Sequence, residues 1–338
     1  MDLRLTDTKI FDPSLQTQGT RASRSSTLGW WKEPLQGSRF ALSFFLLCLV
    51  LSLVACGGQE EGATGGGQET EAVAKLLFTA IPDQNTTELK EKFQPLADYL
   101  STALDVIVEY VPAHDYQASV EMFKNGDVHL AWYGGLTGVQ ARDAVEGARA
   151  IAQGEADPQY YSYFIAHKDT GLEKSDEFPA AVADLKFTFG SESSTSGRLM
   201  PEFFIQENSG KSPEEFFSET MGFSGSHDKT VELVESGAYQ AGAVNYKVYQ
   251  KRVKAGKTDP DVCRVIWQTP FYADYNWTAH PDLETAFGEG FTERLQQALV
   301  SIDDPTLLSA LPRERLIPAV NEEFEGIRKV AQSLGMLR

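Results

Sequence analysis

The segment TFGSESSTSG at residues 188–197 places a run of hydroxyl and glycine residues between two apolar stretches. An alternating apolar stretch enters it from residue 185, and residues 199–205 leave it with helical apolar spacing. The turn therefore lies where a helix should begin. There the first backbone N–H groups lack intrahelical partners and the helix dipole is positive, so a tetrahedral anion can bind to neutral donors alone. The alternative is that Ser194 or Ser196 only caps the helix.

The charge of the chain is strongly negative. Its 338 residues carry a net charge of −18, and without the first 55 residues 24 basic and 44 acidic residues remain, a net charge of −20. Such a surface argues against nucleic acid and anionic lipid as partners. An anionic ligand must then be held by a local site, because the field of the whole protein repels it.

The N-terminal region predicts a secreted, lipid-anchored protein. The apolar run at 40–55 is short for a membrane span and suits the core of a signal peptide, so residues 1–55 are expected to be a signal peptide with an N-terminal extension of no clear pattern. The ending Leu-Val-Ala-Cys resembles a bacterial lipobox with Cys56 as the lipidated residue. A short membrane anchor is the alternative. Residues 56–74, rich in Gly, Glu and Gln, predict a flexible tether.

Cysteine and histidine usage speaks against disulfide and metal chemistry. Cys48 lies in the signal and Cys56 at its end, which leaves Cys263 alone in the body and excludes an intrachain disulfide there. A lone cysteine in an apolar strand is more often core than nucleophile. The five histidines lack the paired spacing of metal ligands, so we expect no metal site and no cofactor.

From residue 75 onward, short apolar runs alternate with amphipathic helical stretches. Strands are expected at 75–81, 106–111, 128–133, 148–153, 160–167, 185–190, 241–245 and 262–268. Helices are expected at 86–104 and 116–125, from the glycines at 134–135 through about 144, and at 198–208, 227–237, 246–255, 284–301 and 321–334. This order predicts an α/β fold with a largely parallel sheet, divided into two lobes. The segments 133–135, 190–197 and 271–277 follow strands, so we expect them to meet in a cleft that closes by hinge motion.

Four short segments carry a resemblance to a known family. In chain order they are Ala131-Trp132-Tyr133-Gly134-Gly135, Ser193-Ser194-Thr195-Ser196-Gly197, Gly225-Ser226-His227-Asp228 and Gly242-Ala243-Val244-Asn245. With the lipobox they resemble the phosphonate-binding family of periplasmic solute-binding proteins of ABC transporters, and are most similar to its phosphite-binding branch. The resemblance implies a bilobal, type II periplasmic-binding-protein fold. Two α/β lobes, 75–162 plus 273–338 and 163–272, would be joined by two crossover segments.

The resemblance also implies which residues contact the ligand. The family's Ser-Thr-Ser turn, which holds the phosphonate oxygens, falls on residues 194–196. Its histidine falls on His227, and its carboxylate after the second crossover falls on Asp274. The implied ligand-binding residues are Ser194, Thr195, Ser196, Gly197, His227, Asp274, Tyr116, Tyr161, Tyr133 and Tyr163, the last as a rival of Tyr161.

Each of these residues also has a structural alternative. A tyrosine in an α/β core most often packs with its hydroxyl satisfied, and Tyr133 beside Trp132 suits the core of lobe 1. For His227 the structural alternative is a cap of the helix that follows it, and for Asp274 it is a turn residue without contact to a ligand. If His227 does contact an anion, its charged form is favoured.

Two positions separate this chain from binders of aminoalkylphosphonates. Those members carry a second carboxylate where this chain has Asn245 and Tyr246, and it meets the ammonium of the ligand. Without it a cationic tail loses its charge partner, which disfavours aminoethylphosphonate. Asp274 would accept a hydrogen bond from a protonated P–OH, and would therefore select a singly protonated oxyanion over sulfate.

These observations predict a lipid-anchored binding protein, monomeric and not an enzyme, that delivers a small phosphorus oxyanion to an ABC permease and its ATPase at the outer face of the membrane. Phosphite is the first expected ligand and methylphosphonate the next. Phosphate or selenate binding is one alternative, and a sensor that presents its ligand to a membrane kinase is another. An enzyme on the same fold is disfavoured, because the chain has no Gly-x-Ser-x-Gly elbow and no Ser-x-x-Lys at the turn.

Overall fold

The computed structural model describes residues 74–337. The predicted signal peptide at 1–55, Cys56 and the tether up to residue 73 lie outside this part of the chain. No helix between residues 74 and 337 is both long and apolar enough to cross a membrane.

Two mixed β-sheets organise these residues. The first has the strand order β11-β4-β10-β3-β1-β2, and the second has the order β7-β6-β8-β5-β9. The strands of the first sheet are β1 (Lys75–Ala80), β2 (Ile107–Tyr110), β3 (Leu130–Tyr133), β4 (Arg149–Gly154), β10 (Asn276–Ala279) and β11 (Leu316–Pro318). Those of the second are β5 (Ser162–His167), β6 (Phe187–Phe189), β7 (Gly222–Phe223), β8 (Ala241–Asn245) and β9 (Cys263–Gln268).

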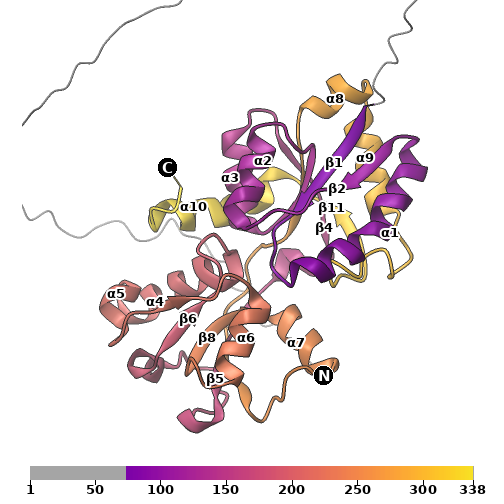
Figure 1. Cartoon of the computed structure of the whole chain (residues 1–338). Helices are drawn as coiled ribbons and strands as arrows, with labels where there is room; N and C mark the ends of the chain where they lie inside the picture. Colours follow the sequence, from indigo (N-terminus) through magenta and orange to yellow (C-terminus); the bar gives the residue numbers. More distant parts are fainter. Residues whose placement is uncertain (1–73, 338) are drawn as a thin grey trace, which may run out of the picture. The chain divides into compact units, whose positions relative to one another are not determined.

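Helices surround each sheet, and Figure 1 shows α1, α2, α3 and α9 around the first sheet and α4, α5, α6 and α7 around the second. The helices are α1 (Thr86–Leu104), α2 (Tyr116–Lys124), α3 (Gly135–Ala144), α4 (Met200–Ser209), α5 (Pro213–Phe216), α6 (His227–Glu235), α7 (Tyr246–Lys254), α8 (Asp282–Phe287), α9 (Phe291–Val300) and α10 (Glu325–Ser333). Short 3-10 turns lie at Asp157–Gln159, Lys168–Thr170, Ala180–Asp184 and Asn321–Phe324. We call the part built on the first sheet lobe 1 and the part built on the second sheet lobe 2.

The two-lobed α/β architecture confirms the predicted fold class, and the structure corrects three details. The first sheet is not largely parallel: β1 pairs in parallel with β2 and β3, whereas β10 and β4 pair antiparallel with their neighbours. The helix expected at 284–301 is two helices, because Gly288 and Gly290 adopt left-handed backbone angles between them. The strands β7, β10 and β11 and the short helix α5 were not expected. The predicted lobe limits, 75–162 with 273–338 and 163–272, stay a prediction, although each sheet draws its strands from within or next to them.

Local signals explain where the helices begin. Asn85 caps α1, because its side-chain oxygen accepts the N–H groups of Thr87 and Glu88. Asn245 caps α7 in the same way through Lys247 and Val248. The buried face of α1 repeats at helical spacing: Leu89, Phe93, Leu96, Ala97 and Leu100.

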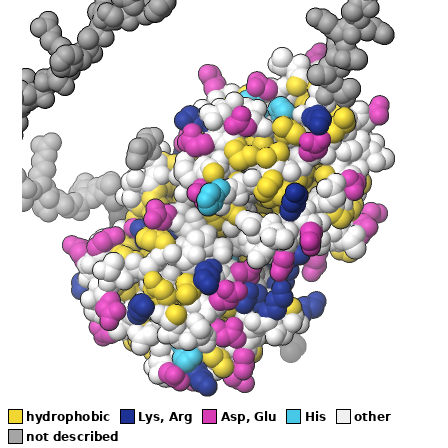
Figure 2. All heavy atoms as spheres, in the orientation of Figure 1, with side chains coloured by type: hydrophobic (Ala, Val, Ile, Leu, Met, Phe, Trp, Pro, Cys, Tyr) yellow, Lys and Arg dark blue, Asp and Glu magenta, His cyan; other side chains and the backbone are white. Residues whose placement is uncertain are grey.

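Charge is distributed unevenly over the surface. Figure 2 shows Asp and Glu side chains scattered over the visible face and a group of Lys and Arg side chains beside α7, at the boundary between the lobes. The last turn of α7 carries Lys251, Arg252 and Lys254. One group of cations in this acidic chain therefore lies where the two lobes meet, while others are scattered over the visible face.

Two crossovers connect the lobes, at residues 155–161 and 269–275. They pair with each other through an antiparallel bridge in which Tyr160 and Tyr272 exchange backbone hydrogen bonds of 2.8 and 2.9 Å. The hinge is therefore a two-stranded ribbon, which permits a twist of one lobe against the other while it holds the chain segments together.

A buried ion pair fastens this ribbon to lobe 1. Arg313, in the segment before β11, lies 2.6 Å from the carboxylate of Asp157 in the first crossover, and both side chains are at most 2% exposed. The guanidinium also lies over the rings of Tyr160 at 5.3 Å and Tyr275 at 4.7 Å, one from each crossover. Arg313 thus contacts both crossovers at once.

Replacement of Arg313 tests this role. Arg313→Met leaves the carboxylate of Asp157 buried without a counter-charge, so we expect the free energy of unfolding in urea to fall by about 3–5 kcal/mol. Arg315→Met is the matched control, because Arg315 pairs with Glu155 where both side chains are 59% exposed, and its loss should be below about 1 kcal/mol. Equal losses in the two variants would contradict the assignment.

Candidate anion-binding site

The hydroxyl turn lies between β6 and α4 and opens with a single π-helical turn, Thr195–Leu199. The N–H of Leu199 donates to the carbonyl of Ser194 over 2.9 Å, and the hydroxyl oxygen of Ser194 accepts the N–H of Gly197 over 3.0 Å. Ser194 therefore does cap the helix, as the structural alternative expected. Capping and anion binding are compatible, because the cap uses an oxygen lone pair and leaves the hydroxyl proton free.

The hydroxyl of Thr195 also accepts a backbone N–H, in this case from a residue of lobe 1. Its hydroxyl oxygen accepts the N–H of Leu136, at the start of α3 in lobe 1, over 2.9 Å. The carbonyl of Ser196 accepts from the hydroxyl of Ser162 over 2.7 Å, which fixes the peptide between Ser196 and Gly197. Both Ser194 and Thr195 thus have an acceptor position occupied and can donate through the hydroxyl proton, which Thr195 can also direct to the carboxylate of Asp274.

Several buried polar atoms have no hydrogen-bond partner in the part of the chain that the structure describes, and three of them belong to predicted site residues. They are the hydroxyl of Tyr116, Nε2 of His227 and Oδ2 of Asp274. Buried polar groups are nearly always paired, so a cluster of orphaned atoms calls for a partner of another kind. A bound ligand is such a partner.

The surroundings of two glycines place the side chains of His227 and Asp274 beside the turn. A Cβ placed on Gly197 would lie 2.9 Å from Oγ of Ser194 and 3.1 Å from Cε1 of His227. A Cβ placed on Gly134 would lie 3.0 Å from Oγ1 of Thr195 and 3.2 Å from Oδ1 of Asp274. Glycine at these two positions lets the backbone approach both sides of the turn.

His227 is held as a neutral hydrogen-bond donor. Its Nδ1 accepts the backbone N–H of Asn245 over 3.3 Å, so in the neutral ring the proton lies on Nε2, the orphaned atom. Burial lowers the pKa of His227 to about 3, so the ring is neutral without a ligand, and the expectation that a bound anion favours the charged form stays a prediction. The side chain is fully buried at the start of α6, whereas its capping role belongs to Ser226.

Asp274 is the acceptor in this group of donors. Its Oδ1 accepts the N–H of Gly135 over 2.8 Å, and its Oδ2 is orphaned within residues 74–337. Burial raises the pKa of Asp274 to about 7, although the Gly135 N–H and the Thr195 hydroxyl act against this rise. The carboxyl group therefore exchanges its proton near neutral pH.

Tyr116 is the predicted tyrosine that the structure places at the turn. Burial raises the pKa of Tyr116 well above 10, the charge of Asp83 and that of Asp274 raise it further, and the nearby hydroxyl of Ser194 lowers it. The side chain is 2% exposed at the start of α2. Its hydroxyl remains protonated at every ordinary pH and can donate.

The other predicted tyrosines have partners elsewhere. Tyr133 donates its hydroxyl to the carbonyl of Ser119 over 2.7 Å in the core of lobe 1. Tyr161 stacks on Tyr246 with ring centroids 3.8 Å apart, and the hydroxyl of Tyr163 accepts from Gln250 over 3.1 Å. The structure does not bring these three side chains to the orphaned atoms.

Sequence reasoning missed several residues that border the site. Asp83 follows β1 and accepts the hydroxyl of Tyr275 over 2.9 Å, and burial raises its pKa to about 6. Tyr272 shares a hydrogen bond with Ser162, which in turn supports the turn. A usable signal existed for Asp83: it lies directly after the carboxyl end of a parallel strand, as do the segments that were singled out.

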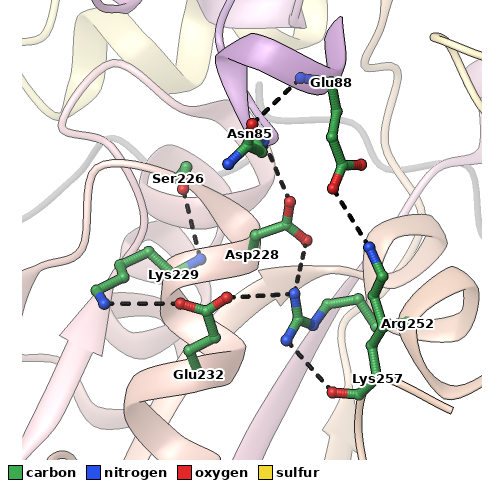
Figure 3. A pocket seen from close by; sticks show the side chains of 8 residues that line it. All are labelled: Asn85, Glu88, Ser226, Asp228, Lys229, Glu232, Arg252 and Lys257. Atoms are coloured by element: carbon green, nitrogen blue, oxygen red, sulfur yellow. Dashed lines mark hydrogen bonds and ion pairs between the residues drawn. The ribbon is translucent and has the colours of Figure 1, made fainter. Parts of the chain in front are cut away.

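A second charged group lies at the rim between the lobes. A cavity there is lined by Asn85, Glu88, Ser226, Asp228, Lys229, Glu232, Arg252 and Lys257, and Figure 3 shows its three cations directed at carboxylates. Arg252 lies 3.2 Å from Asp228, Lys257 lies 3.3 Å from Glu88 and Lys229 lies 3.6 Å from Glu232. Because each cation already has a carboxylate, this rim cavity suits an anion less well than the turn does.

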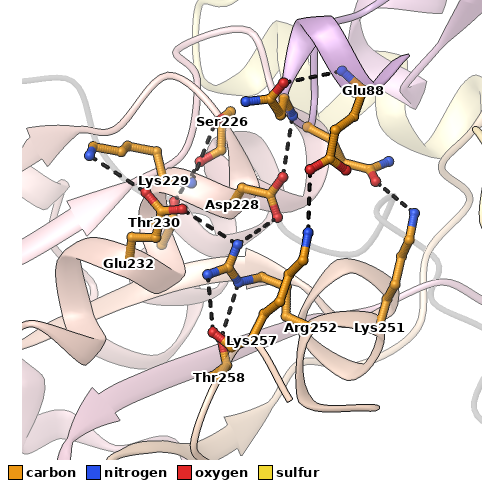
Figure 4. Close-up of polar contacts among 12 residues, drawn as sticks. Glu88, Ser226, Asp228, Lys229, Thr230, Glu232, Lys251, Arg252, Lys257 and Thr258 are labelled. Atoms are coloured by element: carbon orange, nitrogen blue, oxygen red, sulfur yellow. Dashed lines mark hydrogen bonds and ion pairs between the residues drawn. The ribbon is translucent and has the colours of Figure 1, made fainter. Parts of the chain in front are cut away.

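The rim instead joins the lobes. The N–H of Asn85 in lobe 1 donates to Asp228 in lobe 2 over 3.3 Å, and Lys251 donates to Gln84 over 3.0 Å. Figure 4 shows these contacts running from α6 and α7 to the start of α1. The Asn85 contact is exposed and the Lys251 contact is partly buried. Polar contacts near the surface each contribute little, so these two guide the arrangement of the lobes rather than hold it.

Replacing the acceptor of the site should stabilise the protein without ligand. The pKa of Asp274 lies at about 7 when folded against 3.8 for an unperturbed carboxyl. Its contribution to stability is therefore complete below about pH 4 and is lost as pH rises to about 7, because the unfolded chain releases this proton first. Asp274→Asn has no such proton.

We therefore expect the urea midpoint of Asp274→Asn to exceed that of the wild type more at pH 8 than at pH 4. Other carboxyl groups that titrate in this range, including Asp83, contribute equally to both proteins and cancel in the difference. A difference between the two midpoints that does not change with pH would contradict the assignment of a perturbed pKa to Asp274.

Comparison with known proteins agrees with this geometry. A model of the family described as "ABC transporter, phosphonate, periplasmic substrate-binding protein" matches residues 78–324. The probable ABC transporter phosphite binding protein PhnD1 of Prochlorococcus marinus (strain MIT 9301) is 39% identical over 270 residues, which cover 78% of this chain and 91% of that protein. The phosphate-import protein PhnD of Mycolicibacterium smegmatis is 28% identical and covers 85% of this chain and 94% of its own length.

A solved structure shows the same fold. The structure of PhnD1 from Prochlorococcus marinus in complex with methylphosphonate superposes with a TM-score of 0.73 at 38% identity, and covers 78% of this chain and 98% of that one. The proteins of this family are periplasmic and serve transport rather than catalysis. The chain belongs to the family of periplasmic phosphonate-binding proteins of ABC transporters.

Proposed function

We propose that this chain is a lipid-anchored binding protein that captures a small phosphorus oxyanion, phosphite first and methylphosphonate next, and delivers it to an ABC permease. The observation that carries the proposal is the set of buried donors around the turn with one orphaned carboxylate oxygen among them. Lipid on Cys56 would hold the protein, as a monomer, at the outer face of the membrane. PhnD1 of Prochlorococcus marinus is described as a probable phosphite binding protein and has been solved in complex with methylphosphonate, and both ligands belong to the proposed class.

The donors and the acceptor match one protonation state of the ligand. Ser194, Thr195 and the Nε2–H of His227 can each donate to an oxygen of the anion. Oδ2 of Asp274 can accept only if the ligand brings a proton, as the P–OH of hydrogen phosphite does. Fully ionised sulfate brings none, so it can bind only while Asp274 itself is protonated, and above about pH 7 the carboxylate repels it.

The site contributes no unpaired positive charge that could balance a dianion. His227 is neutral, and the nearby Arg313 is already paired with Asp157. A monoanion with one proton therefore leaves no buried charge unmatched by hydrogen bonds. Water is excluded on closure, which strengthens each of these contacts.

A cationic ligand tail finds no partner near positions 245–246. The amide of Asn245 is already bonded to Tyr160 and Tyr275, and Tyr246 packs against Tyr161. Neither residue carries charge to meet an ammonium group. This supports a small, uncharged substituent on phosphorus and disfavours aminoethylphosphonate.

The geometry supports binding in two steps. The turn at residues 194–197 belongs to lobe 2 and can receive the anion in an open arrangement. Closure then adds Tyr116 and the N–H of Leu136, which already bonds to Thr195 across the cleft. Within the described residues no hydrogen bond links a hydroxyl to His227. An esterase needs a hydroxyl activated by such a base, so this observation supports capture rather than catalysis.

Calorimetry of residues 74–338 with five anions tests the proposal. We expect phosphite to bind tightest, methylphosphonate next, and phosphate, selenate and aminoethylphosphonate more weakly. Above pH 7 the affinity for phosphite should fall up to tenfold per pH unit, because Asp274 and the ligand then both lose the proton they share. Asp274→Asn should flatten this dependence. Tighter binding of aminoethylphosphonate than of phosphite would overturn the ligand choice.

The hydroxyl turn has its own test. The double variant Thr195→Ala with Ser196→Ala removes two hydroxyl donors, and hydrogen bonds to a charged group contribute about 1.5–3 kcal/mol each, so phosphite affinity should fall roughly 100-fold or more. Ser193→Ala is the matched control in the same turn, and its affinity should stay within about twofold of the wild type. If the double variant binds phosphite as the wild type does, the turn is only a helix cap.

A further inference from the structure

Four hydrogen bonds join one proposed ligand donor to the hinge in a closed ring. The N–H of His227 donates to the carbonyl of Asp83 over 3.1 Å, and the hydroxyl of Tyr275 donates to the carboxylate of Asp83 over 2.9 Å. Nδ2 of Asn245 donates to the hydroxyl of Tyr275 over 2.7 Å. The N–H of Asn245 then donates to Nδ1 of His227 over 3.3 Å and closes the ring.

The four members come from parts of the chain that move relative to one another when the hinge opens. Asp83 follows β1 in lobe 1, and Tyr275 ends the second crossover. His227 begins α6 and Asn245 precedes α7, both in lobe 2. Tyr160, from the first crossover, also donates its hydroxyl to Asn245. The side chain of Asn245 thus bonds to both crossovers.

We propose that Asn245 is a positioning residue, through which the two crossovers set the orientation and tautomer of His227 before a ligand binds. This inference rests on the proposed function, because His227 is there a donor to the ligand. Tyr275 and Tyr160 hold the amide of Asn245 in place. Its backbone N–H then fixes Nδ1 of His227 as an acceptor and directs the Nε2 proton toward the turn.

The ring requires an amide at position 245. The hydroxyl proton of Tyr275 is already given to Asp83, so Tyr275 can only accept from residue 245. Oδ1 must accept from Tyr160 and from the N–H groups of Lys247 and Val248 at the start of α7. An aspartate supplies the acceptors but sets a carboxylate oxygen against the lone pairs of Tyr275.

The charges around the ring do not replace this donor. Arg313 lies over the rings of Tyr160 and Tyr275, but its charge is matched by Asp157. Asp83 lies within the ring, and burial and the charge of Asp228 both raise its pKa. A second carboxylate at position 245 would therefore face Asp83 through a shared tyrosine.

The matched pair of variants is Asn245→Asp and Asn321→Asp. Asn321 makes the same two kinds of amide bond far from the ring: its Oδ1 accepts from Ala150 over 2.8 Å and its Nδ2 donates to Ala148 over 3.3 Å. We expect Asn245→Asp to weaken phosphite binding at least tenfold and Asn321→Asp to stay within twofold of the wild type. Equal affinities in the two variants would overturn the proposal.

A spectroscopic readout separates positioning from helix capping. In protein labelled with ¹⁵N-histidine and assigned through His227→Gln, the wild type should show an unprotonated Nδ1 and a protonated Nε2 on His227 without any ligand. Asn245→Asp should shift both resonances toward a mixture of tautomers. A loss of affinity with unchanged His227 resonances would mean that Asn245 serves only as a cap, and would overturn the proposal.

Tyr275→Phe provides a second approach should Asn245→Asp fail to fold. It removes the hydroxyl between Asn245 and Asp83, so the same resonance shift and a comparable loss of phosphite affinity are expected, and unchanged His227 resonances would overturn the ring. Because the resonances are read without ligand, this arm is independent of the proposed function. A wild type that shows the expected tautomer yet binds no phosphite would refute the ligand and leave the ring intact.

Discussion

The buried ion pair between Arg313 and Asp157 is the interaction on which the rest of the structure depends. It places a guanidinium against tyrosines of both crossovers, and it fixes the first crossover where the backbone of Asp157 accepts the N–H of Asp274 over 3.1 Å. A single cation thus sets where the ribbon leaves lobe 1 and where the carboxylate of the site lies. Such a pair gives little net stability, so its value lies in the geometry that it specifies.

The site is built by using up the acceptor capacity of its hydroxyls. Backbone N–H groups occupy oxygen positions on Ser194 and Thr195, and the N–H of Asn245 occupies Nδ1 of His227. Each group keeps a proton to donate, although Thr195 can also direct its proton to Asp274. A set of groups that donate is complementary to an anion without carrying charge. In the proposed function, Asp274 supplies the acceptor that distinguishes a protonated anion from an ionised one.

The sequence determined the local features of the site more fully than the distant ones. The turn at 194–197 is predictable because a helix start is set by neighbouring residues. Gly288 and Gly290 broke an expected helix, since a left-handed backbone depends on residues that apolar spacing does not weigh. Strand β10 was not predicted, because it forms when the second crossover returns to the first sheet and pairs antiparallel with β3 and β4, and no window along the chain contains those distant partners.

The hydrogen-bond partners of the tyrosines could not be predicted from the sequence. Tyr161 and Tyr163 lie two residues apart at the start of β5, so they share a face, and that face packs on Tyr246 and Tyr249 rather than on the turn. Tyr275 looked like one aromatic among several, yet its hydroxyl lies between Asp83 and Asn245. The local pattern predicts that a tyrosine is buried, but the packing of the two lobes and the crossovers decides which hydroxyl has a hydrogen-bond partner. In this chain that packing leaves the hydroxyl of Tyr116 without a hydrogen-bond partner within the described residues, which is why we propose Tyr116, and not Tyr161 or Tyr163, as a donor to the ligand.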